Sequence, residues 1–280
     1  MNTELIAGLR PLLKTYAYNI CGSVDDADDV VQDVLIKYLG LDEAKIDNPR
    51  SYLIRMVINR AINQKKSLNK RVVNYPGEWL PEPVEMESAD SGISKKELLS
   101  YSLLVLLEKL NPRQRAVFIL KEAFDYEHAE IAEVLDIKPD LSRQLLTRAR
   151  KSIGDPKPVT HNSVSKSFLN NYLNILHSGD MERLEAMLND DIVSISDGGG
   201  KARAAIKPVF GKKSVAALLK GLYTRFYEHA VVRYGIINQQ PALLYYQDGI
   251  LAKCMIFTLV NDQISSAYII RNPDKLKNLN

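Results

Sequence analysis

Basic and amide side chains that could read DNA are spaced along residues 124–153, with the sequence FDYEHAEIAEVLDIKPDLSRQLLTRARKSI. The apolar spacing predicts two short helices joined by a tight turn at Asp136. Pro139 fits the first position of the second helix, where its missing N–H costs nothing. We expect the inner face of that helix to carry Leu141, Leu145, Arg148 and Ala149. The outer face would then carry Asp140, Arg143, Gln144, Thr147, Arg150 and Lys151.

Such a helix, with a basic and amide-bearing outer face and a second helix to hold it, fits the major groove of DNA. The competing interpretation is an ordinary amphipathic helix pair with a solvated charged face. Arg148 would bury its stem and pair its guanidinium within the protein. The formal net charge is only +3 over 280 residues, so nucleic-acid binding would have to come from local basic patches.

A second candidate surface is acidic and follows the capping sequence Ser23-Val24-Asp25-Asp26. The helix predicted there is apolar on one side. Its other side carries Asp26, Asp29, Gln32, Asp33 and Ile36. Since Ile36 is apolar, this face indicates a protein partner that is basic at its rim and apolar at its centre. An acidic face that only improves solubility is the alternative.

A third candidate surface belongs to the helix that begins at Asn48-Pro49, where Asn caps and Pro takes the first position. One side of this helix is apolar. The other offers Tyr52, Arg55, Asn59, Ile62, Asn63 and Lys66. Aromatic, amide and basic groups on one face can stack on unpaired bases and hydrogen-bond to them. A solvated charged face competes with this interpretation.

Length and composition set the frame for these surfaces. A chain of 280 residues predicts two or three domains, and a hydrophobic content of 46% supports real cores. Cys21 and Cys254 lie far apart and outside any metal-ligand spacing, which predicts no zinc site, no disulfide framework and a reducing, cytoplasmic location. We expect no cofactor and no metal. Neither a signal peptide nor an apolar stretch long enough to span a membrane is evident.

The order of patterns predicts four parts. Residues 1–70 are helical, and 71–92 form a linker broken by prolines, in which Trp79-Leu80 should dock on another surface. Residues 93–154 form a helical module that starts with a helix over 93–110. After a break at 154–158, residues 161–280 predict an α+β domain: helices first, then an antiparallel sheet curled around them.

These stretches together resemble a known family. DDADDVVQDVLIKYL, NPRSYLIRMVINRAINQKK, FDYEHAEIAEVL and RQLLTRARK, in this order, resemble regions two and four of an extracytoplasmic-function sigma factor. WLPEP at 79–83, DGGGK at 197–201 and NPDKL at 272–276 are similar to motifs of a subgroup with a fused SnoaL-like, cone-shaped α+β domain. The resemblance implies a multidomain fold of two all-α sigma modules, the second with a helix-turn-helix, followed by that α+β domain.

The resemblance also implies roles. Core RNA polymerase would contact Asp29, Gln32, Asp33 and Ile36. The melted promoter strand near position minus ten would contact Tyr52, Arg55, Asn59, Asn63 and Lys66. The minus-thirty-five element would contact Arg143, Gln144, Thr147, Arg150 and Lys151. The sequence at the start of the recognition helix, KPDLSRQLL, departs from commoner family sequences, so promoter preference does not carry over.

Two modules joined by a linker would bind two separate promoter elements, so whatever holds the linker can control both. We therefore expect the C-terminal domain to control the sigma modules in cis, with no separate anti-sigma factor required. Candidate regulatory contacts are Trp79, Leu80, Pro81, Glu82, Pro83, Asp197, Gly198, Gly199, Gly200, Lys201, Asn272, Pro273, Asp274, Lys275 and Leu276. The alternatives for DGGGK and NPDKL are a plain tight turn and a tail with a Pro turn.

Two other functions stay open at this point. One is a helix-turn-helix regulator with a sensor domain, which would have no use for the face containing Ile36. The other is an isomerase or cyclase with a pocket formed by Asp197, Tyr223, Tyr227, His229 and Tyr245, although these residues form no local catalytic signature. A pocket that holds a regulatory small molecule is a further expectation, alongside core polymerase and promoter DNA as partners.

Overall fold

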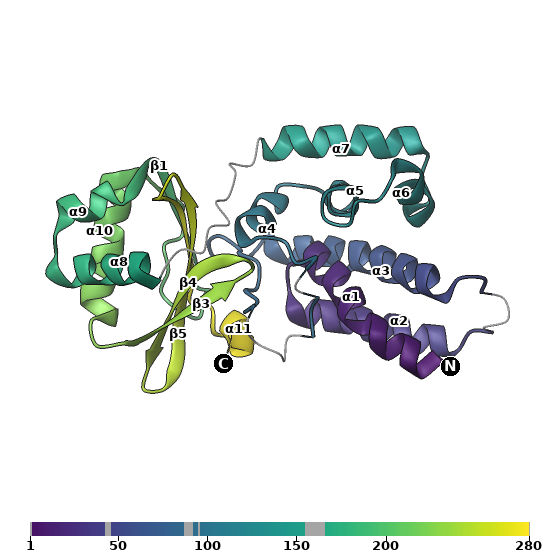
Figure 1. The fold of residues 1–280 in the computed structure, drawn as a ribbon, viewed down its shortest axis with the longest axis horizontal. Helices are drawn as coiled ribbons and strands as arrows, with labels where there is room; N and C mark the ends of the chain where they lie inside the picture. Colours follow the sequence, from purple (N-terminus) through teal and green to yellow (C-terminus); the bar gives the residue numbers. More distant parts are fainter. Residues whose placement is uncertain (1, 43–45, 87–91, 95, 155–165, 280) are drawn as a thin grey trace. The chain divides into compact units, whose positions relative to one another are not determined.

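The computed structural model describes residues 2–42, 46–86, 92–94, 96–154 and 166–279 (Figure 1). It divides into two compact units. The first unit comprises Met1–Val73 and Ala89–Asp155, and the second comprises Asn74–Ser88 and Pro156–Asn280. Most of the interdomain linker thus belongs structurally to the C-terminal unit. The predicted break at 154–158 and the predicted domain start at 161 fall largely outside the described residues.

The first unit begins with three helices whose starts follow from local capping. They are α1 (Asn2–Cys21), α2 (Val24–Leu39) and α3 (Pro49–Val72). The Ser23 hydroxyl accepts the backbone N–H of Asp26, and the Asn48 side chain accepts that of Ser51. These bonds satisfy donors that the helices cannot satisfy themselves. The three helices pack on one another around fully buried residues such as Leu13, Val57 and Ala61.

The second part of this unit contains α4 (Tyr101–Leu107), α5 (Pro112–Glu122), α6 (His128–Leu135) and α7 (Pro139–Ile153). Asp136, with φ of 51°, ends α6 in the left-handed conformation and produces the tight turn of the helix-turn-helix. The turn lets α6 and α7 pack against each other and against α5.

The prediction of one helix over 93–110 was wrong, because its described residues before Tyr101 are not helical. Side chains of α1 satisfy the backbone there instead. The Thr15 hydroxyl accepts the N–H of Ser94, and the Asn19 amide donates to the carbonyl of Glu97 at 2.9 Å. Since the polar backbone groups find tertiary partners, the segment gains little from helical hydrogen bonds.

The second unit has the predicted α+β order. Its elements are α8 (Lys166–Ser178), α9 (Met181–Ala186), β1 (Leu188–Asp197), β2 (Val209–Phe210), α10 (Lys212–Leu222), the π-helix η2 (Tyr223–Tyr227), β3 (Val231–Ile237), β4 (Gln240–Gln247), β5 (Ile250–Val260), β6 (Gln263–Ile270), α11 (Pro273–Leu276) and the 3₁₀ turn η3 (Lys277–Leu279). Helices α8, α9 and α10 gather on one side of the sheet, and their apolar faces form one core with it (Figure 1).

The sheet has the order β2-β1-β6-β5-β4-β3, and it corrects one expectation. It is not wholly antiparallel, because β1 pairs with β6 in parallel. Three tight hairpins connect the later strands through residues with positive φ, at Asn238-Gln239, Asp248-Gly249 and Asn261-Asp262. The first turn ends at Gln239, so Gln240 and Pro241 are already part of β4. Among the described residues, no helix has the length and apolar character needed to cross a membrane.

Candidate functional site

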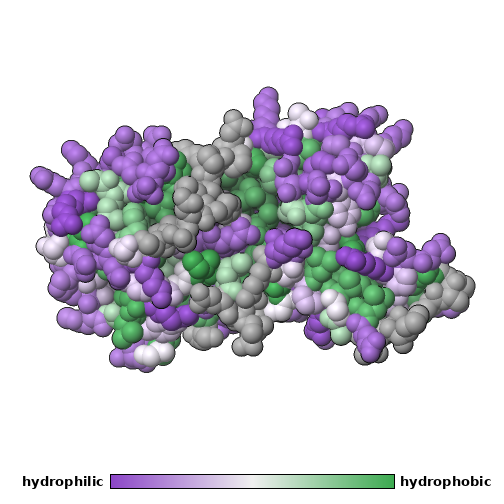
Figure 2. All heavy atoms as spheres, viewed as in Figure 1, coloured by the Kyte–Doolittle hydropathy of each residue, from purple (hydrophilic) through white to green (hydrophobic). Residues whose placement is uncertain are grey.

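The outer face of α7 carries the polar side chains that the sequence predicted. Exposed there are Asp140, Arg143, Gln144, Thr147, Arg150 and Lys151. Figure 2 shows hydrophilic side chains over the outer side of this helix. Arg143 pairs with Asp140 and Arg150 with Glu122, each at 2.6 Å. Pairs this exposed contribute little to stability, so both guanidinium groups can exchange to phosphate or base acceptors.

The inner face of α7 differs from the prediction. Leu141 is 37% exposed and Arg148 is also exposed, so Arg148 does not bury its stem. Ser142 and Leu146 are buried in their place. The helix turns this way because the Ser142 hydroxyl lies 2.9 Å from Nδ1 of His128 on α6, which gives a buried polar residue a partner.

On α3, four of the five predicted strand-binding residues are exposed: Tyr52, Arg55, Asn63 and Lys66. Asn59 is half-buried, because its amide donates to the backbone carbonyl of Val134 on α6 at 2.8 Å. Ile62, expected on this outer face, is buried. The first helix of the helix-turn-helix therefore contacts the same face of α3 that carries the candidate base-binding residues.

A cavity of about 390 Å³ extends this contact between α3 and α6. Tyr52 and Arg55 line it from α3, and Glu130 and Glu133 line it from α6. The carboxylates of Glu130 and Glu133 thus lie beside the candidate base-binding residues, where they would repel the phosphates of a nucleic acid. The three N-terminal helices and the helix-turn-helix are closed against each other in this structure.

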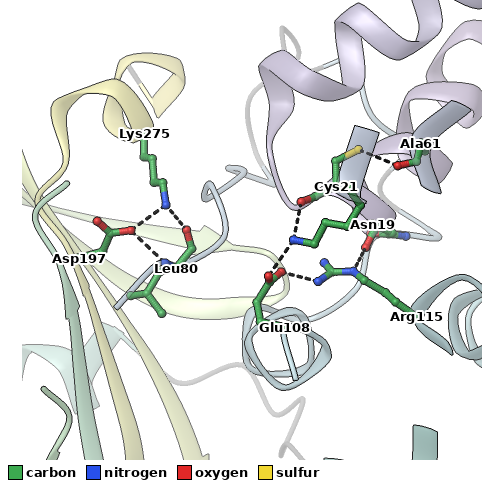
Figure 3. A network of polar contacts seen from close by, with 9 residues as sticks. Asn19, Cys21, Ala61, Leu80, Glu108, Arg115, Asp197 and Lys275 are labelled. Carbon is green, nitrogen blue, oxygen red and sulfur yellow. Dashed lines mark hydrogen bonds and ion pairs between the residues drawn. The ribbon is translucent and has the colours of Figure 1, made fainter. Parts of the chain in front are cut away.

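A buried polar network also joins α3 to α4 and α5 (Figure 3). Lys65 donates to Glu108 at 2.7 Å and to the carbonyl of Cys21 at 3.0 Å, while Arg115 pairs with the other oxygen of Glu108. Nε of Arg115 donates to the carbonyl of Asn19 at 3.0 Å. Burial, aided by nearby Arg115, lowers the pKa of Lys65 to about 8. Burial alone would raise the pKa of Glu108, but Arg115 and Lys65 outweigh it and lower that pKa.

On α2, the predicted acidic and apolar face lies at the surface. Asp29 and Gln32 are exposed, and Ile36 is 63% exposed. Asp33 is half-buried and accepts two bonds from Arg60, at 3.0 Å from Nε and 2.7 Å from Nη2. Leu39, one turn further along α2, is 66% exposed and extends the apolar surface beyond Ile36.

In the second unit, the three motifs of the linker and the C-terminal domain meet at Asp197. This carboxylate, only 1% exposed, accepts the Tyr75 hydroxyl at 2.6 Å, the backbone N–H of Leu80 at 2.9 Å and the Lys275 ammonium at 2.7 Å. Lys275 also donates to the carbonyl of Leu80 (Figure 3). We call this group, Asp197 with Tyr75, Leu80 and Lys275, the Asp197 site. It ties the end of β1 and the helix α11 to the linker.

The tryptophan of the linker takes part in the same site. The Lys275 ammonium lies 4.0 Å from the centroid of the Trp79 ring, a cation–π contact, and the ring is half-buried. Leu80 is 1% exposed, so the predicted docking of Trp79-Leu80 on another surface is what the structure contains. Burial and the hydrogen bond to Asp197 raise the pKa of Tyr75 above its ordinary value, so its hydroxyl keeps its proton and remains a donor.

Further along, the linker adds to the sheet edge at β3. The N–H of Val84 donates to the Asn238 side chain at 2.8 Å, and Met86 donates to the carbonyl of Ile236 at 2.8 Å. Glu85 accepts both ends of the Arg233 guanidinium, at 2.7 and 3.1 Å. Backbone pairing of this kind gives affinity, and the bidentate ion pair gives register.

Two glycines of the DGGGK turn are required because neighbouring residues leave no room for a Cβ atom. A Cβ on Gly199 would lie 2.3 Å from the Asn272 amide nitrogen, and one on Gly200 would lie 2.8 Å from the Pro76 ring. Asn272 in turn donates to the Tyr75 hydroxyl at 2.9 Å. The turn is therefore built around the linker and NPDKL. Lys201 and Asp274, from the two motifs, form an exposed ion pair at 2.6 Å.

Sequence reasoning missed Tyr75, Glu85, Arg233, Asn238 and Asn278 as contributors to this docking. Tyr75 lies just before the Pro76-Gly77 break, and nothing in its local pattern marks it. Pro81, Glu82 and Pro83 are buried as well, and Glu82 accepts a hydrogen bond from Asn278 at 2.7 Å. The catalytic pocket considered for an isomerase or cyclase does not form around Asp197, because the linker groups Tyr75 and Leu80 bind its carboxylate.

Comparison with known proteins agrees with this architecture. Residues 5–71 match the family model "Sigma-70 region 2", and residues 100–153 match "Sigma-70, region 4". These two modules and the α7 surface define a sigma factor of the sigma-70 type. A relative from Mycobacterium tuberculosis, the ECF RNA polymerase sigma factor SigJ, is 30% identical over 297 residues, which cover 98% of this chain and 93% of SigJ. The chain belongs to the family of extracytoplasmic-function (ECF) RNA polymerase sigma factors.

A probable ECF sigma factor from the same species, SigI, is 24% identical, with 95% of this chain and 92% of SigI covered. The crystal structure of SigJ superposes with a TM-score of 0.80 at 27% identity and covers 99% of both chains. The predicted fold class of two helical sigma modules followed by an α+β domain is confirmed. The protein is a sigma factor and not an enzyme, and its partners are core RNA polymerase and promoter DNA.

Proposed function

We propose that the C-terminal domain controls this sigma factor in cis by holding its linker. The observation that carries the proposal is the Asp197 site, where one buried carboxylate binds Tyr75, Leu80 and Lys275. The linker segment is docked along its length, from Tyr75 to Met86. In this arrangement no separate anti-sigma factor is needed, and the protein works in the cytoplasm with polymerase.

The span between promoter elements supports this proposal. Two elements read by the two modules lie on the order of 50 Å apart, about one and a half turns of duplex. A relaxed linker over 71–92 spans roughly 25 Å, and a stretched one about 70 Å. The linker must therefore be extended when both modules are on DNA. A docked linker is held in one fixed conformation and cannot adjust its span to the two elements, so docking and two-site promoter binding compete.

The closed state of the first unit adds a second requirement. Asn59 donates to Val134, and Glu130 and Glu133 share a cavity with Tyr52 and Arg55. The base-binding face of α3 becomes free only when α6 leaves it. Release of the linker would allow that separation.

We assign roles on this basis. The minus-ten strand contacts Tyr52, Arg55, Asn59, Asn63 and Lys66. The minus-thirty-five element contacts Arg143, Gln144, Thr147, Arg150 and Lys151. Core polymerase contacts Asp29, Gln32, Asp33 and Ile36. The exposure of Ile36 and the basic outer face of α7 support the last two assignments.

Transcription in vitro with core polymerase tests the control. The full-length chain is compared with a chain ending at residue 154 and with Trp79→Ala. Glu78→Ala is the matched control, since Glu78 is the exposed neighbour of Trp79. We expect truncation and Trp79→Ala to change transcription in either direction while Glu78→Ala does not. If both variants transcribe like the full-length chain, control by docking is refuted, whereas a chain that ignores core polymerase in a pull-down would refute the sigma function itself.

A further inference from the structure

The C-terminal domain contains two basic side chains, Lys253, which is buried, and Arg271, which is half-buried, near the same tyrosine ring. Lys253 on β5 is 1% exposed, and Arg271 follows β6 directly. Within the part of the chain that the structure describes, no carboxylate pairs with either side chain. Arg271 donates through Nη1 to the carbonyl of Arg203, but its Nε has no partner among those residues. Buried charges are normally paired, and burial without an anion disfavours the protonated form of Lys253, so this site lacks the group that would stabilise that charge.

Aromatic rings enclose these cations. The Lys253 ammonium lies 3.4 Å from the centroid of the Tyr245 ring and 3.8 Å from that of Tyr227. The Arg271 guanidinium lies 5.7 Å from the Tyr227 ring and 5.6 Å from that of Phe226. The hydroxyl of Tyr245 is buried and finds no hydrogen-bond partner among the described residues, whereas that of Tyr227 is buried beside the guanidinium of Arg271. Unpaired polar groups are costly to bury and call for an explanation, such as a ligand.

The backbone around this cluster is irregular in two places. Tyr227 ends the π-helix η2, and β4 changes register between Tyr245 and Tyr246. Both π-helical turns and β-bulges occur often at functional sites, where they redirect side chains. A cavity of about 870 Å³ opens beside them and is lined by Phe226 and Tyr246, among others. Phe226 thus links the cavity with the guanidinium of Arg271.

We propose that the C-terminal domain binds an aromatic carboxylate, with the carboxylate paired to Lys253 and Arg271 and the ring against Tyr227 and Phe226. A carboxylate can accept two bonds from a guanidinium and further bonds from an ammonium and phenol hydroxyls. The aromatic walls favour a flat apolar body over a strongly hydrated anion such as phosphate. Binding to this site is tested on the protein without polymerase or DNA, so the result does not depend on the linker control proposed above.

Proton linkage gives this site a signature. Burial, together with Arg271, lowers the pKa of Lys253 well below its ordinary value. A bound carboxylate would raise that pKa, so binding takes up a proton and tightens as pH falls. The titratable and charged groups around the ammonium are Tyr227 of η2, Tyr245 of β4, Cys254 of β5 and Arg271, which follows β6.

Isothermal titration of the full-length chain with benzoate tests the proposal, with benzamide as the neutral probe of nearly the same shape. We expect benzoate to bind at least roughly tenfold more tightly than benzamide, since a charged hydrogen bond is lost with the amide. Titrations in two buffers of different ionisation enthalpy should report proton uptake with benzoate alone. Equal binding of the two probes, or no binding of benzoate at millimolar concentration, would overturn the inference.

Variants separate the site from general effects. Lys253→Met should weaken benzoate binding roughly tenfold or more and abolish the benzoate-dependent rise in Tm. Without benzoate its Tm should rise, because burying the Lys253 amine has a cost whether or not it is protonated, and methionine replaces it with an apolar chain of similar length. Lys212→Met, at an ion pair with Asp190 elsewhere in the domain, is the control and should bind benzoate like the wild type. If Lys253→Met binds benzoate as tightly as the wild type, the proposed site is refuted. If the variant does not fold, the comparison of benzoate with benzamide on the wild type decides whether the site exists.

Discussion

Replacing Asp197 with asparagine should release the linker from the C-terminal domain. The substitution keeps the shape of the side chain but removes its charge. It also turns one acceptor oxygen into an N–H donor that faces other donors. These donors are the Tyr75 hydroxyl, the Leu80 N–H and the Lys275 ammonium, all within 2.9 Å of the carboxylate oxygens.

The magnitude follows from the burial of the ion pair. The side chain of Asp197 is 0% exposed and that of Lys275 is 10% exposed. Removing one partner of such a pair leaves an uncompensated buried charge, which costs about 3–5 kcal/mol. Since 1.4 kcal/mol is a factor of ten, the ratio of docked to released linker should fall roughly 140- to 3,700-fold.

Trp79 supplies the assay, because it is the single tryptophan of the chain. In the docked linker its ring is half-buried and lies 4.0 Å from the Lys275 ammonium. Release should shift its fluorescence emission to the red and increase quenching by acrylamide, while circular dichroism shows that both units stay folded. Asp274→Asn is the matched control, since its pair with Lys201 is 56–60% exposed and contributes less than about 1 kcal/mol. A folded Asp197→Asn chain with wild-type emission and quenching would refute the reasoning.

Two further predictions concern the packing of each unit. Gly199→Ala should lower Tm and release Trp79, because its Cβ would lie 2.3 Å from the Asn272 amide. Gly249→Ala is the control, since Gly249 also has positive φ but has open space around it. A larger loss of Tm for Gly249→Ala than for Gly199→Ala in a thermal melt would contradict this. For Lys65, the folded pKa of about 8 lies below the ordinary 10.5, so the unfolded chain holds the proton between these values. The unfolding free energy of the wild type should therefore rise with pH across this window, by up to about 3 kcal/mol relative to Lys65→Met, as measured by urea denaturation. A difference between the two proteins that stays constant with pH would exclude this linkage.

Local signals in the sequence determined most of the helices and the turns. Asn48-Pro49 and Asn111-Pro112 mark helix starts because a cap and a proline act within one turn of chain. Asp248-Gly249 and Asn261-Asp262 mark hairpins because these residues tolerate positive φ. The outward faces of α2, α3 and α7 were also largely predictable, since helical periodicity depends only on neighbours along the chain.

Only the tertiary structure decided which distant groups meet. Side chains of α1 kept residues before Tyr101 out of a helix, and Ser142 rather than Leu141 faced the core because His128 offered it a partner. The parallel pairing of β1 with β6 likewise depends on chain crossing, which alternation within one strand cannot report. The three motifs were visible in the sequence, but their meeting at one buried carboxylate was not. Tyr75 lies 122 positions from Asp197, and a hydrogen bond across that separation leaves no periodic trace in the residues between them.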